Sequence, residues 1–207
     1  MKRIINDTLR IFLITLISGL MLGLVYEVTK EPIKEANDNA KRESLEKVFP
    51  DASAYSDPCD IENTEELFKQ YDLEGVRIDE VISCFEATSS TGWPLGYCIT
   101  ATSSKGYGGD ITVMVGISRD KGTVLGISIL SLDETPGLGM KSTEEAFYGQ
   151  YSKENYIGLF NVTKTGAKAE NEIDAISGAT KTSRAVTDAV NAAVAYYMNF
   201  LAEGGTK

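Results

Sequence analysis

The most apolar segment of the chain lies near its start, where residues 11–26 carry no charge. As an α-helix this segment would be about 24 Å long, and apolar neighbours extend it toward the roughly 30 Å of a bilayer core. A cleaved signal peptide is the alternative, but no small-x-small cleavage site follows Tyr26. We therefore expect an uncleaved transmembrane helix over residues 11–28.

The charges around this segment predict its orientation. Three basic residues and one acidic residue give residues 1–10 a net charge of +2, which leaves −12 for the rest of a chain whose net charge is −10. Because positively charged flanks stay on the cytoplasmic side of a membrane, we expect residues 1–10 in the cytoplasm. The sequence thus predicts a single-pass protein of the cell (inner) membrane with an extracytoplasmic domain.

A charge-rich segment follows the apolar one. Residues 29–50 combine good helix formers with many charges, and Pro32 is tolerated in the first turn of a helix. We expect a stalk helix over residues 29–50. The remainder, residues 51–207, is predicted to form one extracytoplasmic domain that begins with a loop and a short helix over residues 64–71.

Apolar and polar side chains alternate in the middle of the chain, which is the pattern of strands in an antiparallel sheet. Four strands are expected, over residues 80–88, 96–102, 110–118 and 123–130. The last two would form a hairpin, and each would direct one row of apolar side chains to one face: Ile111, Val113, Val115 and Ile117 in the first, and Leu125, Ile127 and Ile129 in the second.

Two further segments have helix signals. Residues 142–145 (STEE) match a capping box, which predicts a helix that continues to about residue 151. A last helix is expected over residues 182–202, where Val186, Val190, Val194 and Tyr197 have helical spacing. The predicted fold class is α+β: a single N-terminal transmembrane helix, then a domain with a mainly antiparallel sheet and flanking helices.

Composition narrows the chemistry. The chain contains no histidine, which excludes Ser-His-Asp, Cys-His and His-metal sites. Its acidic balance, with 20 Lys+Arg against 30 Asp+Glu, gives no reason to expect nucleic-acid binding. Three separated cysteines cannot supply the four thiolates of an iron–sulfur cluster and permit at most one internal disulfide. We expect them to be small buried side chains with at most one bridge.

Residues 177–183 (SGATKTS) place four hydroxyl side chains where an extended segment, residues 173–176, becomes the last helix. The free N–H groups and partial positive charge of a helix start suit a phosphate. Gly178 and Ala179 let a ligand approach the backbone, and Lys181 adds a cation. The alternative is that the hydroxyls only cap the helix, because Ser and Thr are favoured N-caps.

Residues 177–182 (SGATKT) resemble the flavinylation motif of a family of FMN-binding domains. The family occurs in the G subunit of the Rnf electron-transport complex and in the C subunit of the Na⁺-translocating NADH:quinone reductase. In it, a flavin transferase joins FMN through its phosphate to the threonine that corresponds to Thr180. Residues 134–139 (ETPGLG) and 106–109 (GYGG) are similar to two further motifs of the family, in the same order.

The resemblance implies a cofactor site, with no catalytic or metal-ligating residue in this chain alone. Thr180 would carry the covalent phosphoester. The other implied FMN contacts are Ser177, Gly178, Ala179, Lys181, Thr182, Ser183, Glu134, Thr135, Gly137, Leu138 and Gly139. The roles of three residues stay open. Glu134 would either hold its loop in shape or lie near the flavin, and Lys141 would either contact the phosphate or be solvated. Tyr107 would either stack on the flavin ring or pack against its own sheet.

The resemblance also implies a function. The chain would be an electron-relay subunit of a membrane-bound Rnf-type complex that couples electron transfer between ferredoxin and NAD to Na⁺ or H⁺ translocation. It would contact the other membrane and redox subunits of that complex. A length of 207 residues favours the G subunit of the Rnf complex over the typically longer C subunit of the quinone reductase. A free-standing extracytoplasmic flavin reductase and a non-enzymatic scaffold are the alternatives.

Overall fold

The computed structural model describes residues 2–85, 94–153 and 156–202, and its contacts divide the chain into two compact units, Met1–Arg42 and Glu43–Lys207. The elements in chain order are α1 (Lys2–Val48), β1 (Ala54–Tyr55), α2 (Glu65–Gln70), β2 (Val76–Phe85), β3 (Gly96–Ser103), β4 (Ile111–Ser118), β5 (Val124–Ser131), the short helix η1 (Gly139–Thr143), α3 (Glu145–Tyr148), η2 (Gly149–Tyr151), β6 (Asn161–Thr163), β7 (Glu172–Asp174), α4 (Thr180–Tyr196) and the π-helical turn η3 (Tyr197–Leu201).

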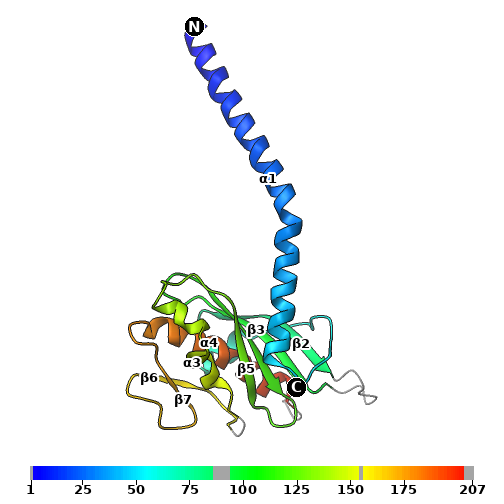
Figure 1. Cartoon of the computed structure of the whole chain (residues 1–207), viewed down its shortest axis with the longest axis vertical. Coiled ribbons are helices and arrows are strands. Elements are labelled where there is room, and N and C mark those ends of the chain that lie inside the picture. Colours follow the sequence, from blue (N-terminus) through cyan, green and yellow to red (C-terminus); the bar gives the residue numbers. More distant parts are fainter. Residues whose placement is uncertain (1, 86–93, 154–155, 203–207) are drawn as a thin grey trace. The chain divides into compact units, whose positions relative to one another are not determined.

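Helix α1 is continuous through both the predicted transmembrane segment and the predicted stalk (Figure 1). Pro32 therefore lies inside one helix rather than at the start of a second one. The apolar side chains of residues 11–28 are exposed in this unit, and the helix is long and apolar enough to cross a membrane. The helix ends at Val48, next to the predicted end of the stalk.

The second unit is built on a five-stranded antiparallel sheet with the order β1-β2-β3-β4-β5 (Figure 1). The four predicted strands are confirmed as β2 to β5, although β2 begins at Val76, and residues 86–88 of the predicted strand lie outside the described residues. The short helix predicted over residues 64–71 is α2. β1 and β6 were not predicted, because strands of two or three residues are too short to show alternation. β7 covers only the first two residues of the extended segment expected over residues 173–176.

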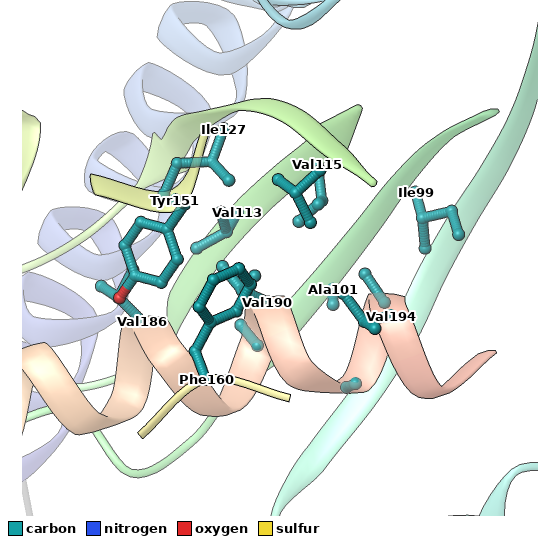
Figure 2. Close-up of a cluster of buried hydrophobic side chains, with 14 of the residues drawn as sticks. Ile99, Ala101, Val113, Val115, Ile127, Tyr151, Phe160, Val186, Val190 and Val194 are labelled. Carbon is teal, nitrogen blue, oxygen red and sulfur yellow. The ribbon is translucent and has the colours of Figure 1, made fainter. Parts of the chain in front are cut away.

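Helix α4 packs on one face of the sheet, called here the inner face. Figure 2 shows Val186, Val190 and Val194 of α4 directed at side chains of the strands. These three valines are at most 1% exposed, which confirms the helical spacing read from the sequence. The inner-face cluster also contains the predicted row of β4, namely Ile111, Val113, Val115 and Ile117. The helix begins at Thr180, two residues before its predicted start.

The predicted inward row of β5 is wrong at Leu125. The register of the β4–β5 pair shifts between Gly116 and Ile117, so that Gly116 pairs with Gly126 but Ile117 pairs with Val124. Leu125 is the extra residue on β5, and such a bulge turns the side chains on its two sides out of simple alternation. Val124 is consequently buried, and Leu125 is exposed.

The predicted capping box at residues 142–145 is also wrong. Ser142 lies inside η1 and is fully buried, and its hydroxyl donates a hydrogen bond to the carbonyl of Gly139 (2.7 Å). α3 instead starts after Glu144, which makes no side-chain cap, and the predicted helix is divided into η1, α3 and η2. Ser142 therefore closes the preceding turn, since a Ser hydroxyl bonds backbone carbonyls in turns as readily as N–H groups at helix starts.

The opposite face of the sheet, called here the outer face, carries a second cluster. It joins the last turn of α1 and the following loop to apolar side chains of β2, β3 and β4; its buried members are Leu45, Val48, Phe49, Ala52, Ile82, Cys84, Cys98 and Met114. The backbone of Val48 comes so close that a Cβ at Gly116 would overlap its carbonyl oxygen. Glycine at this position thus lets the end of α1 lie directly on β4.

This close approach predicts different costs for two paired glycines. A Cβ at Gly116 would overlap the Val48 carbonyl, whereas a Cβ at Gly126 would lie 3.7 Å from the Val48 Cα, an ordinary van der Waals contact. We expect Gly116→Ala to lower the free energy of unfolding by about 1–3 kcal/mol, the usual cost of overpacking. Gly126→Ala, the matched control, should change it by less than about 1 kcal/mol. Denaturant unfolding of the detergent-solubilised protein measures both, and equal effects would contradict the packing described.

Candidate functional site

Three loops meet at one end of the second unit. Residues 106–109 connect β3 to β4, residues 132–138 follow β5, and residues 175–179 lead into α4. Glycines allow the close approach of the first two loops, because a Cβ at Gly108 would overlap the carbonyl of Asp133. The loops that contain the three sequence motifs are therefore brought together by backbone packing.

Glu134 links the first loop to the second. Its Oε1 accepts a hydrogen bond from the backbone N–H of Tyr107 (2.8 Å). A Cβ at Gly139 would lie 2.5 Å from Oε2 of the same carboxylate, so only glycine leaves room for it there. Glu134 thus holds the first two loops together and also lines the cavity described below, so its predicted place near the flavin stays a prediction.

The ETPGLG motif forms a type II β-turn. The N–H of Leu138 donates to the carbonyl of Thr135 (3.1 Å), and Gly137, at the third position, has φ of 76°. This turn type needs a positive φ at the third position, which favours Gly, and Pro is common at the second position. The turn presents the side chain of Leu138, 42% exposed, toward the third loop, where a Cβ at Gly178 would lie 3.1 Å from Leu138 Cδ2.

The third loop is held from inside by Ser183. Its hydroxyl accepts a hydrogen bond from the N–H of Ile176 (3.0 Å) and donates one to the carbonyl of Ala179 (3.0 Å). Ser183 is fully buried and does not line the cavity, so its position supports a role in fixing the loop rather than a contact with a cofactor. Between these anchors, Gly178 takes a left-handed φ of 78° that favours glycine.

The loops enclose a cavity of about 270 Å³. Its lining combines hydroxyl, charged and apolar side chains with glycine backbone: Tyr107, Glu134, Thr135, Leu138, Gly139, Gly178, Ala179, Lys181 and Thr182. Thr182 is 1% exposed, and among the described residues no hydrogen bond reaches its hydroxyl. A hydroxyl that lines a cavity without a protein partner is suited to a polar ligand atom.

A second hollow of about 550 Å³ adjoins the cavity and shares Gly178 and Lys181 with it. Thr180 lines this hollow, together with Ser177 and with Lys164 from the segment after β6. Lys164 was not predicted, because nothing in the sequence around it forms a motif. Of the other predicted contacts, Gly137 lines neither hollow, and Lys141 lies with Ser177 in a third hollow beside α3.

The start of α4 carries positive potential. Thr180 is the first residue of this 17-residue helix, and the first turn contains no acidic residue. The N–H groups of a first turn have no partner within their own helix, and the helix dipole adds about half a positive charge. The Lys181 ammonium extends outward and lies 5.8 Å from the ring centroid of Tyr107. An anion therefore meets both backbone donors and a cation at this point.

The capping alternative for the hydroxyl cluster is not what the structure contains. The N-cap of α4 is Ala179, with no side-chain cap hydrogen bond. Thr180 is half-buried and lines the second hollow, and no hydrogen bond to its hydroxyl occurs among the described residues. Thr180 is thus accessible for chemistry rather than engaged in closing the helix.

An ion pair ties the first loop to α4. The Nζ of Lys105, next to the GYGG loop, lies 3.4 Å from Oδ2 of Asp188. Burial raises the pKa of the Asp188 carboxyl above its usual range, and the nearby Lys105 charge acts in the opposite direction. The pair helps to hold the start of this loop beside α4.

These loops define a class of protein. Residues 106–195, which include all three loops and nearly all of α4, match the family model of the FMN-binding domain. Two relatives extend the similarity along the chain. The G subunit of the Na⁺-translocating ferredoxin:NAD⁺ oxidoreductase complex of Acetobacterium woodii is 32% identical over 91% of this chain and 89% of that protein. The G subunit of an ion-translocating oxidoreductase complex of Methanosarcina acetivorans is 29% identical, over 94% and 95%.

Among solved structures, the C subunit of the Na⁺-translocating NADH-quinone reductase of Parabacteroides distasonis matches with a TM-score of 0.49 and 16% identity, over 83% of this chain and 96% of that chain. The long sequence matches show the family: the chain belongs to the G-subunit family of ion-translocating oxidoreductase complexes.

Proposed function

We propose that this chain is the electron-relay subunit of an Rnf-type complex that couples electron transfer between ferredoxin and NAD to Na⁺ or H⁺ translocation, and that it carries FMN joined through its phosphate to Thr180. Membership of the G-subunit family supports the assignment to such a complex. The complex of the A. woodii relative is named as Na⁺-translocating, and that of a Clostridium ljungdahlii relative as proton-translocating. The observation that carries the proposal is an accessible, unpartnered Thr180 hydroxyl at the start of α4, beside a cavity in an FMN-binding domain.

The surroundings of Thr180 fit a phosphoester. A phosphodiester keeps one negative charge, which the free N–H groups of the first turn of α4 and its dipole can stabilise. Lys164 and Lys181 line the same hollow as Thr180 and bring two cations to it in an otherwise acidic chain. A β-branched threonine also has a stiff χ1, which fixes the direction of the linkage.

The cavity fits part of a flat ring system with polar edges. Leu138 and Tyr107 offer apolar surface, while the hydroxyls of Thr135 and Thr182 offer hydrogen bonds at the lining. Its volume of about 270 Å³ is at the low end for ligand pockets, and Tyr107 and Leu138 are 72% and 42% exposed, so one edge of the site stays open. FMN, when bound, supplies reversible electron transfer, and this chain supplies its position and electrostatic environment.

We further propose that α1 anchors the domain in the cell membrane with residues 1–10 in the cytoplasm. Cys59 provides a test, because it is exposed while Cys84 and Cys98 are buried. A membrane-impermeant maleimide should label Cys59 in right-side-out vesicles without detergent, and Cys59→Ser should remove the label. An Ile4→Cys substitution in the Cys59→Ser protein should be labelled only after permeabilisation. The reverse pattern would place the domain in the cytoplasm.

Two experiments separate the alternatives. The affinity-tagged protein should co-purify from its host with polytopic Rnf-type subunits. If it purifies without partner subunits, a free-standing flavin reductase is favoured. If it purifies with quinone-reductase subunits, the C subunit of that enzyme is favoured. The tryptic peptide of residues 169–181 contains Thr180 and should be heavier by the mass of FMN less one water. This modification should require a flavin transferase in the same cell, and an unmodified peptide in an active complex would favour a scaffold.

The bridge between Glu134 and Tyr107 predicts a change in the flavin environment without loss of the covalent bond. Glu134→Ala removes the acceptor of the 2.8 Å hydrogen bond and leaves the Tyr107 N–H unpaired, so the first two loops separate. We expect iodide to quench the flavin fluorescence of this folded variant about two- to three-fold more strongly than that of the wild type, in line with the loss of about 0.5–1.5 kcal/mol per hydrogen bond. Glu134→Gln keeps an acceptor and should resemble the wild type; equal quenching in all three proteins would contradict the bridge.

A further inference from the structure

Two cysteines meet on the outer face of the sheet. Cys84 of β2 and Cys98 of β3 lie on adjacent antiparallel strands, where Cys84 pairs with Gly96 and Cys98 pairs with Ile82. They are diagonal neighbours on one face, and their Sγ atoms are 3.1 Å apart. That separation is shorter than the roughly 3.5–4.0 Å at which non-bonded heavy atoms make optimal contact.

The surroundings of the pair are apolar. Cys84 is 0% exposed and Cys98 is 1% exposed, within the cluster formed by Leu45, Val48, Phe49 and Met114. The only other hydrogen bond to either sulfur among the described residues is a weak one from Cys84 Sγ to the carbonyl of Ile82 (3.9 Å). Each thiol thus has the other as its principal partner in a region that water does not reach.

We propose that Cys84 and Cys98 form a disulfide that joins β2 to β3 beneath the end of α1. The proposal rests on the proposed extracytoplasmic location, because disulfides persist in oxidising compartments. The oxidant is the disulfide of a thiol–disulfide oxidoreductase. One cysteine thiolate attacks a sulfur of that disulfide and releases the first oxidant thiol. The second cysteine then attacks the mixed disulfide and releases the second thiol. Two cysteine thiols are oxidised, one disulfide is reduced, and both protons pass to the oxidant's thiols.

Burial determines when this exchange occurs. In the folded protein the hydrogen bond with Cys84 and the apolar surroundings raise the pKa of the Cys98 thiol far above its usual range, so the reactive thiolate does not form. The cover provided by Val48 and Phe49 also excludes an oxidant. The bond therefore forms while the outer face is still uncovered, during folding, and it afterwards resists reductants until the protein is unfolded.

Cys59 does not compete for either partner. It is exposed, and its Sγ lies 4.0 Å from the hydroxyl of Ser83. Successive side chains of a strand point to opposite faces, so Ser83 and Cys84 face opposite sides of the sheet. Cys59 therefore lies away from the outer-face pair and remains a free thiol.

The chain offers a direct mass test. Trypsin leaves both cysteines in one peptide, residues 78–105, which contains no other cysteine. The full-length protein from its host is denatured with iodoacetamide and without reductant, then digested. We expect this peptide to be unalkylated and about 2 Da lighter than its dithiol form, because disulfide formation removes two hydrogens, while Cys59 is alkylated. Treatment of the native protein with dithiothreitol should leave the bond intact, and the same treatment in denaturant should break it.

A refolding experiment tests the Cys84–Cys98 pairing separately from the proposed extracytoplasmic location. The detergent-solubilised full chain is unfolded, reduced and refolded with oxidised and reduced glutathione. A linked peptide after refolding and in the host supports the proposal. A linked peptide after refolding but not in the host supports the pairing and contradicts the extracytoplasmic location. Two alkylated cysteines after refolding, or a Cys59–Cys84 link, overturns the proposal. Cys59→Ser should leave the link unchanged, and Cys84→Ser should leave Cys98 alkylated.

Discussion

Thr180→Val should abolish the flavin fluorescence of the protein band in a denaturing gel, whereas the wild type should fluoresce under ultraviolet light. The reason is chemical: a phosphoester needs a hydroxyl oxygen, and valine has the shape of threonine without one. The expected effect is complete loss, because noncovalent flavin does not survive denaturation. Both proteins must be produced in a host that contains the flavin transferase.

The structure predicts that this substitution leaves the fold intact. Thr180 is partly exposed at the first position of α4, and its hydroxyl has no partner among the described residues, so valine loses no internal hydrogen bond. Thr180→Ser keeps a hydroxyl and should keep fluorescence. Ser177→Ala removes the other exposed hydroxyl of the loop and should also keep it. Fluorescence that persists in Thr180→Val but disappears in Ser177→Ala would contradict attachment at Thr180 and indicate attachment at Ser177.

Gly178→Ala should lower the yield of covalent flavin at a fixed maturation time by about ten-fold. Gly178 has φ of 78°, and an added Cβ would lie 3.1 Å from Leu138 Cδ2. A non-glycine residue in this region costs about 1–3 kcal/mol, and relief of the strain shifts the loop immediately before Thr180. Since about 1.4 kcal/mol corresponds to a ten-fold change, the competent loop becomes a minor conformation.

Gly122 provides a closely matched control. It has φ of 68°, and its added Cβ would lie 3.1 Å from Cε1 of Tyr197, but it belongs to the turn between β4 and β5. The GYGG loop, by contrast, precedes β4 and lies at its opposite end. Gly122→Ala should therefore lower thermal stability to a similar extent and leave the flavin yield unchanged. An equal loss of yield in both variants would attribute the effect to general instability.

Much of the fold was predictable because long elements repeat their pattern. In β4, two isoleucines and two valines at every second position identify the buried face of the strand. In α4, three valines at every fourth position identify the buried face of the helix. Leu125 shows where such reasoning fails: a one-residue bulge depends on the pairing with β4, which alternation along β5 does not contain. The capping-box prediction at Ser142 is wrong for a related reason, since the sequence around this residue suits both a helix cap and a turn.

The site was predictable to a different degree. Motif order identified the three loops that the structure brings together, and eight of the residues implied by the resemblance line the cavity: Glu134, Thr135, Leu138, Gly139, Gly178, Ala179, Lys181 and Thr182. The sequence did not show that Ser183 turns inward to hold the loop, that Glu134 bonds the Tyr107 N–H, or that Lys164 reaches Thr180's hollow. These facts depend on contacts between segments far apart in the chain.

The separation of the three loops along the chain has a consequence for biosynthesis. The ribosome completes residues 106–109 first, residues 132–138 next, and the start of α4 only after about residue 180. A nascent chain that has not yet released α4 lacks the backbone amides and the Thr180 hydroxyl that we propose as the FMN attachment point. If the proposed attachment needs all three loops, it is a post-translational step on a folded substrate, and the apoprotein must persist until FMN is attached.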